Sequence, residues 1–153
     1  MRCGNYSNYQ PQTNFKGTVN VPKLKQLAKQ VEPEAVKTII GNTNVEKLEQ
    51  FAKEWADIPN DKLYAYFGCC DLNLALKQQN INALFKKQGY TNYEDYRAVT
   101  DEVTHKNYKF VKQMANNNKV DITMLRIILH ELNGGRMSLN EAYHKMQSGN
   151  LYA

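Results

Sequence analysis

Hydrophobic residues along the chain recur every three or four positions, which is the spacing that places side chains on one face of an α-helix. The pattern is clearest in segments 44–55, 92–115 and 121–132. No segment shows the convincing apolar–polar alternation of a half-buried strand. The sequence therefore predicts an all-α protein, and the inward stripes predict that eight side chains are buried: Leu48, Phe51, Trp55, Val103, Phe110, Leu125, Ile128 and Leu129.

Proline, glycine and capping residues divide this pattern into eight or nine short helices. Pro22 suits the first turn of a helix, and Pro33 ends that helix and starts the next one. Thr43 and Glu46 have the spacing of a capping box, which predicts a helix start at this point. The expected helices are 22–31, 34–40, 44–55, 62–67, 72–78, 81–87, 92–115, 121–132 and 138–146, of which 92–115 is expected to be the longest.

The helices are expected to form a single compact domain over residues 21–153, preceded by an extended arm over residues 1–20. The first 31 residues contain five basic residues and no acidic one, whereas residues 32–153 hold 15 of each sign. The net charge of +5 is therefore concentrated near the N-terminus. A basic segment with aromatic side chains favours a strap on an acidic surface of protein or nucleic acid, with contacts from Arg2, Tyr6, Tyr9, Phe15 and Lys16. A solvated tail is the alternative.

Composition limits the class of protein further. The 153 residues are 42% hydrophobic and 23% charged, which is typical of a folded domain rather than of a disordered chain. No apolar run is long enough to cross a membrane, and the first thirty residues lack the hydrophobic core of a secretory signal. The cysteines Cys3, Cys69 and Cys70 form an odd set without metal-binding spacing. We therefore expect an intracellular protein of a reducing compartment, with idle or buried thiols and no membrane contact.

A search for catalytic motifs finds no nucleophile elbow, phosphate loop, dinucleotide fingerprint or paired zinc histidines. Asp101, Glu102 and His105 fall within about one helical turn, where a carboxylate near an imidazole can support acid–base catalysis. Such pairs are far more common on a solvated helix face, where they stabilise the helix. The sequence therefore predicts a non-enzymatic protein that needs no cofactor and no metal.

The segment HELNGGRMSLNE, residues 130–141, resembles an EF-hand loop at some of its twelve positions. Gly135 stands at the sixth position and Glu141 at the twelfth. However, His130, Leu132 and Gly134 occupy positions where calcium needs oxygen donors. We therefore expect an ordinary helix-turn-helix hairpin rather than a calcium site.

The same hairpin could instead read DNA, with residues 124–132 as the supporting helix and the next helix in the major groove. Asn140, His144, Lys145 and Gln147 would then point outward. Glu141 in the first turn of that helix is unfavourable beside phosphates, and residues 121–147 are not basic on balance.

Three functions remain open from the sequence. The leading hypothesis is a non-enzymatic structural or adaptor subunit of a larger assembly, anchored to other protein subunits partly through the arm. The second is a small nucleic-acid-binding regulator of plasmid or viral type, which would use the hairpin and the arm. The third is an inhibitor that occupies the nucleic-acid site of another protein.

Overall fold

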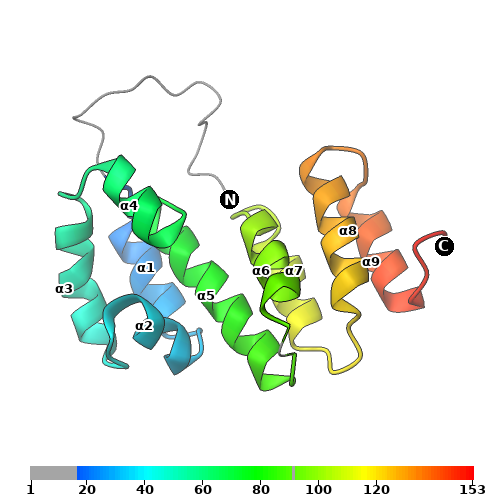
Figure 1. Cartoon of the computed structure of the whole chain (residues 1–153), viewed down its shortest axis with the longest axis horizontal. Helices are drawn as coiled ribbons and strands as arrows, with labels where there is room; N and C mark the ends of the chain where they lie inside the picture. Colours follow the sequence, from blue (N-terminus) through cyan, green and yellow to red (C-terminus); the bar gives the residue numbers. More distant parts are fainter. Residues whose placement is uncertain (1–16, 91) are drawn as a thin grey trace. The chain divides into compact units, whose positions relative to one another are not determined.

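The computed structural model of the chain describes residues 17–90 and 92–153. Over these residues it confirms the all-α fold, with nine helices and one isolated backbone bridge between Thr18 and Asp71 (Figure 1). The helices are α1 (Val21–Ala28), α2 (Pro33–Ile40), α3 (Val45–Trp55), α4 (Asn60–Phe67), α5 (Leu72–Lys87), α6 (Tyr93–Glu102), α7 (Tyr108–Ala115), α8 (Ile122–Asn133) and α9 (Leu139–Ser148).

The start of α3 differs from the prediction. The capping residue is Asn44 rather than Thr43, because Asn44 directly precedes the helix and its side-chain oxygen accepts the Glu46 N–H at 2.9 Å. The start of α8 is as predicted. The Asp121 carboxylate accepts the backbone N–H groups of Thr123 and Met124, in the first turn of the helix. Both residues belong to the types whose side chains satisfy the free N–H groups at a helix start.

The predicted helices 72–78 and 81–87 are one continuous helix, α5, which at 16 residues is the longest of the described helices. The predicted boundary is wrong because the helix continues through the polar residues Gln78, Gln79 and Asn80. Neither residue type breaks a helix strongly. Asn80 is fully buried and accepts the backbone N–H of Glu32 at 2.9 Å, so it serves tertiary packing.

The predicted long helix 92–115 is instead two helices, α6 and α7, separated at Val103–Asn107. Val103 adopts an extended conformation, and Thr104 turns the chain by accepting the Asn107 N–H at its carbonyl oxygen. The side chain of Asn133 in α8 donates to the carbonyl of Glu102 at 2.5 Å, which satisfies a free acceptor at the end of α6. Tertiary hydrogen bonding therefore ends a helix that the hydrophobic stripe alone would continue.

The chain divides into two compact units, unit 1 over residues 1–80 and unit 2 over residues 81–153, and α5 contributes its first part to unit 1 and its second part to unit 2. In unit 1, α1 and α2 both pack against α3. Trp55 is fully buried there and donates its Nε1–H to the carbonyl of Cys70 at 3.1 Å. Leu48 is buried as predicted, whereas Phe51 is only half-buried, with its ring centroid 5.9 Å from that of Trp55.

Residues 17–20, which the prediction assigned to the arm, are attached to the helices of unit 1. Gly17 donates its N–H to the carbonyl of Ile58 at 2.9 Å. Thr18 donates its N–H to the carbonyl of Cys70, and its own carbonyl accepts the N–H of Leu72. The backbone of Asn20 forms two hydrogen bonds with the side chain of Asn73, which is itself buried. These residues therefore belong to the packed unit, although α1 begins at Val21 as expected.

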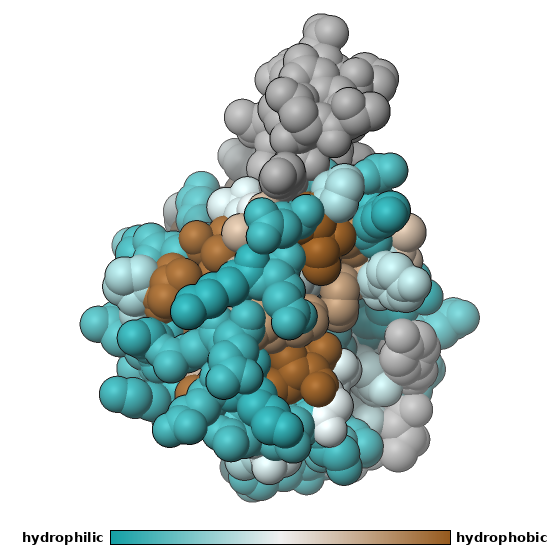
Figure 2. Space-filling view, turned by 90° about the vertical axis from the view of Figure 1, so that its left-hand side faces the viewer, coloured by the Kyte–Doolittle hydropathy of each residue, from teal (hydrophilic) through white to brown (hydrophobic). Residues whose placement is uncertain are grey.

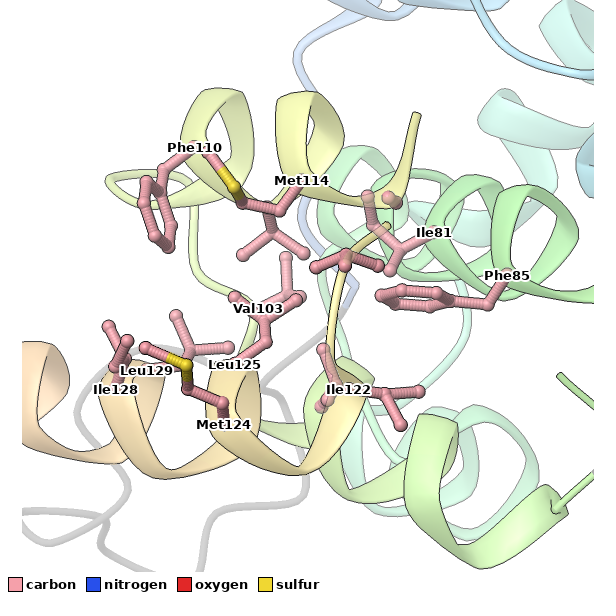
Figure 3. Close-up of a cluster of buried hydrophobic side chains, with 14 of the residues drawn as sticks. Ile81, Phe85, Val103, Phe110, Met114, Ile122, Met124, Leu125, Ile128 and Leu129 are labelled. Atoms are coloured by element: carbon pink, nitrogen blue, oxygen red, sulfur yellow. The ribbon is translucent and has the colours of Figure 1, made fainter. Parts of the chain in front are cut away.

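The hydrophobic core of unit 2 is formed by side chains of five helices and by Val103 and Val120, which lie between helices. Figure 3 shows part of this core, with labelled side chains from α5, α7 and α8 around Val103. The five predicted core residues in this unit are each no more than 1% exposed, which confirms the prediction: Val103, Phe110, Leu125, Ile128 and Leu129. Phe110 also meets Tyr143 of α9 edge-on, with ring centroids 4.8 Å apart. The faces of the helices that point away from this core form the surface of unit 2.

Candidate interaction surfaces

The arm residues proposed to contact a partner, Arg2, Tyr6, Tyr9, Phe15 and Lys16, lie outside the described residues. Their role therefore stays a prediction.

The structural units change the interpretation of the charge. Residues 1–16 hold two basic residues and no acidic one, residues 17–80 hold eight of each, and residues 81–153 hold ten basic and seven acidic residues. Three of the N-terminal lysines, Lys23, Lys25 and Lys29, lie in or next to α1, where Lys25 pairs with Glu49 of α3 at 2.9 Å. Counted by unit, unit 1 with residues 1–16 carries +2 and unit 2 carries +3, because acidic residues later in unit 1 offset its N-terminal lysines.

The hairpin of α8 and α9 is a helix-turn-helix unit, as predicted. Because α8 continues to Asn133, His130 and Leu132 are helical and cannot form the first part of an EF-hand loop, so that alternative is wrong. The turn between the helices is fixed by an ion pair between Arg136 and Glu131, whose Nε and Oε2 atoms are 2.6 Å apart.

The four hairpin residues proposed to contact nucleic acid do not form a basic surface. Asn140, His144 and Gln147 are exposed on α9. Lys145 is half-buried, and its Nζ donates to the carbonyls of Leu151 at 2.5 Å and of Ala153 at 3.1 Å. The only lysine of α9 is therefore engaged with the C-terminal backbone, which leaves α9 without a lysine directed to solvent.

A polar cluster connects the end of α6 to α8. The Glu102 carboxylate accepts from the Asn133 side chain at 2.9 Å and lies 3.3 Å from Nδ1 of His130. Burial works to raise the pKa of Glu102, but the hydrogen bonds from Asn133 and His130 and the charge of His130 outweigh it, so the pKa lies below the usual value. Asn133 also accepts from the buried Asn107 at 2.5 Å, and the cluster thus fixes the turn before α7.

An open pocket of about 310 Å³ lies beside this cluster, with an apolar wall that includes Ile127, which is 42% exposed; its lining residues are Ala98, Glu102, Arg126, Ile127, His130 and Glu131. Its charged rim is already paired. Arg126 lies 3.8 Å from Asp95, Glu102 contacts His130, and Glu131 pairs with Arg136. The carboxylates of Asp101 and Glu102, which the sequence suggested as acid–base candidates, therefore form structural contacts.

The α4 aromatic surface is defined as Tyr64 and Tyr66, and Tyr66 is the most exposed aromatic residue among the helix side chains that the structure describes. Tyr66 is 83% exposed and Tyr64 is 37% exposed, whereas Leu63 on the same helix is fully buried. Viewed from the α3 side, unit 1 is mostly hydrophilic, with hydrophobic surface in small separate patches (Figure 2). A large aromatic ring in solvent on such a unit is a candidate contact for a partner.

The sequence analysis missed a basic surface on and around α7. No Asp or Glu occurs between Glu102 and Asp121, and this stretch contains four lysines, which we name the α7 basic face: Lys106, Lys109, Lys112 and Lys119. The apolar side chains of α7 are buried, while these lysines are exposed or half-exposed. The sequence signal for this surface is the absence of Asp and Glu over a helical segment. A charge count over the whole chain does not reveal it.

No family model, curated protein or solved structure matches this chain. Within residues 17–90 and 92–153, no group of His, Cys, Asp and Glu side chains is arranged to hold a metal ion. Of the helices in the described ranges, none has both the length and the apolar character needed to cross a membrane.

Proposed function

We propose that the protein is a non-enzymatic helical adaptor that holds a protein partner on the α4 aromatic surface of unit 1. The observation that carries this proposal is the 83% exposure of Tyr66 on a helix that is firmly attached to the core. Tyrosine is enriched at protein interfaces, because its ring buries a large apolar area while its hydroxyl finds a hydrogen bond.

The attachment of α4 supports this role. Leu63 is fully buried, and a Cβ atom added at Gly17 would lie 2.5 Å from Leu63 Cδ1, so helix and N-terminal backbone are closely packed. The Phe67 ring lies 5.0 Å from the buried Trp55 ring and 6.3 Å from the Tyr66 ring, measured between centroids. A side chain on a fixed helix loses less conformational freedom on binding than one on a mobile loop.

The chemistry of α4 favours a protein partner over a charged polymer. The helix carries one acidic residue, Asp61, and one basic residue, Lys62, so its charge is balanced. The expected partner surface is an apolar pocket that accepts the Tyr66 ring, with a hydrogen-bond acceptor for the hydroxyl group. Other protein subunits of an assembly fit this description.

The non-enzymatic part of the proposal is supported by how the reactive side chains are used. Asp101 lies 4.0 Å from Arg97, and Glu102 contacts Asn133 and His130. Cys69 and Cys70 are buried in unit 1, where the Cys69 thiol lies 3.3 Å from the carbonyl of Asp71. Each of these groups has a structural contact.

Photocrosslinking tests the proposal directly. The full chain is prepared with p-benzoylphenylalanine at position 66 and, as a matched control, at Tyr152, which is 94% exposed. Each protein is added to nuclease-treated extract of its native source and irradiated. We expect a discrete crosslinked protein from position 66 that is absent from position 152 and is displaced by excess unlabelled protein.

A second measurement uses the crosslinked partner once it is purified. Tyr66→Ser should weaken its binding at least tenfold, whereas Tyr152→Ser should leave binding unchanged. Equal crosslinking from both positions, or unchanged binding of Tyr66→Ser, would contradict the proposal.

A further inference from the structure

We infer that the α7 basic face binds the phosphate backbone of double-stranded nucleic acid. This inference concerns unit 2 and does not depend on the role of α4.

The first argument is the arrangement of α7. Lys109, Lys112, Gln113 and Asn116 stand at positions i, i+3, i+4 and i+7, which is one face of a helix. The opposite face buries Phe110, Val111, Met114 and Ala115 in the core of unit 2. The polar face extends over about 10 Å of helix, and Lys106 and Lys119 lie in the turns before and after it.

The second argument is that this arrangement has an electrostatic cost in the free protein. Within the residues that the structure describes, none of the four lysines forms an ion pair. Lys109 stands in the first turn of α7, where a positive charge opposes the helix dipole, and it repels Lys112 one turn later. A polyanion would remove both penalties.

The third argument concerns the class of polyanion. The polar face offers lysines beside the amides of Gln113 and Asn116, and such side chains contact phosphate and sugar in protein–DNA complexes. Phe110 and the aliphatic side chains of α7 are buried, and Tyr108 packs against the core, so the face has no exposed hydrophobic anchor for a membrane or for an acidic protein.

The shape of the face favours a duplex over a single strand. Proteins that hold single strands stack the bases on exposed aromatic rings. The aromatic side chains of α7 are Phe110, which is buried, and Tyr108, which is half-buried and packs against the core of unit 2. A lysine-bearing helix face without exposed aromatic rings fits a regular array of phosphates.

The test uses the full chain, a fluorescent 20-base-pair duplex of mixed sequence, and anisotropy at several KCl concentrations. If three to four lysines contact phosphates, log K should fall with log salt with a slope of about −2.7 to −3.6. Affinity should then drop about 40- to 150-fold between 50 and 200 mM KCl. The single-stranded 20-mer and polyglutamate, used as competitors, should displace the duplex poorly.

Two double variants separate the effect of the α7 basic face on binding from the effect of the net charge. Lys109→Gln with Lys112→Gln should reduce the salt slope by about 2. The control, Lys37→Gln with Lys47→Gln, changes the net charge equally at exposed positions of α2 and α3 and should keep the slope. Circular dichroism checks folding. If the double variant is misfolded, each single substitution should still reduce the slope by about 1.

The inference is overturned if the duplex does not bind at 50 mM KCl, if both double variants weaken binding equally, or if the single strand or polyglutamate binds more tightly than the duplex.

Discussion

Unit 1 and unit 2 use the same kind of helix packing but present different surfaces. Residues 17–80 have balanced charge and expose Tyr64 and Tyr66, whereas residues 81–153 have a net charge of +3 and expose the α7 basic face. The difference arises on the outward faces, because both cores are built from buried aliphatic and aromatic side chains. The two proposals above therefore assign a protein partner to unit 1 and a nucleic acid to unit 2.

The largest expected effect tests the two cores. Phe110→Ala in unit 2 should reduce the free energy of unfolding by about 3–5 kcal/mol, because the side chain is 1% exposed and contacts the Tyr143 ring. Phe51→Ala in unit 1 should cost only about 1–2 kcal/mol, because that ring is half-buried. Urea unfolding followed by circular dichroism measures both. Equal losses would show that burial does not distinguish these positions.

A medium effect tests the attachment of the N-terminal backbone to unit 1. A Cβ atom at Gly17 would lie 2.5 Å from the carbonyl oxygen of Trp55, and this backbone atom cannot move away freely. Gly17→Ala should therefore reduce stability by about 1–3 kcal/mol. Trp55 is the single tryptophan, so its fluorescence follows unit 1 specifically.

The control for this prediction is Thr18→Ala, which changes an exposed side chain next to Gly17 and should alter stability by less than about 0.5 kcal/mol. Native-like stability of Gly17→Ala would place residue 17 outside the packed unit and restore the predicted arm boundary at residue 20.

A smaller effect concerns the pH dependence of unit 2. The pKa of Glu102 lies below its ordinary value of 4.5, so the unfolded chain binds more protons there than the folded one. The carboxylate therefore stabilises the fold above pH 4.5, and this contribution is lost as the pH falls through the lower folded pKa. Because the Glu102 side chain is still about one-third exposed, solvent screens these contacts, and we expect less than about 1 kcal/mol.

Glu102→Gln checks this expectation. The stability difference between wild type and variant, measured by urea unfolding, should be larger at pH 6 than at pH 3. Asp101→Asn removes a neighbouring exposed carboxylate, 4.0 Å from Arg97, and serves as the control for the loss of one negative charge from α6. A difference that is the same at both pH values would mean that the Glu102 contacts do not favour its ionised form.

The sequence allowed most of the fold to be predicted, because helix-forming stripes and caps are local signals. Seven of the eight predicted core residues are buried, and Phe51 differs because its position on α3 leaves the ring at the edge of the core. The failures at α5 and between α6 and α7 have a common cause. Asn80 and Asn133 form tertiary hydrogen bonds, and the residues they contact are distant in sequence.

The candidate surfaces were less predictable. The helical spacing in the hairpin correctly predicted that Asn140, His144 and Gln147 are exposed. It could not predict that Lys145 contacts the C-terminal carbonyls, because that contact depends on the path of the chain after α9. The exposure of Tyr66 depends on which side of α4 faces Trp55, and this is known only from packing. The α7 basic face was accessible from the sequence, because the lysines lie opposite a hydrophobic stripe.

The smallest expected effect on stability concerns residues 1–16, which hold the arm candidates. Deleting residues 1–16 should change the stability of unit 1 by less than about 0.5 kcal/mol, provided that the described contacts from Gly17 onward suffice. Deleting residues 1–20 should instead destabilise unit 1 by about 2–4 kcal/mol, because it removes the backbone hydrogen bonds of Gly17, Thr18 and Asn20. Trp55 fluorescence during urea unfolding compares the two. A large loss from the shorter deletion would make residues 1–16 part of the fold.

The same region can then be tested for partner binding, using the protein identified by crosslinking at position 66. If charge dominates, Arg2→Gln with Lys16→Gln should weaken binding at low salt and have little effect at high salt, because ions screen exposed charges. If aromatic docking dominates, replacing Tyr6, Tyr9 and Phe15 with Ser should weaken binding at every salt concentration, because burial of apolar rings does not depend on screening. Since residues 17–80 have balanced charge, a salt-sensitive loss would assign the electrostatic part of this binding to residues 1–16. Binding that neither set changes would mean that residues 1–16 are a solvated tail and that the α4 aromatic surface acts without them.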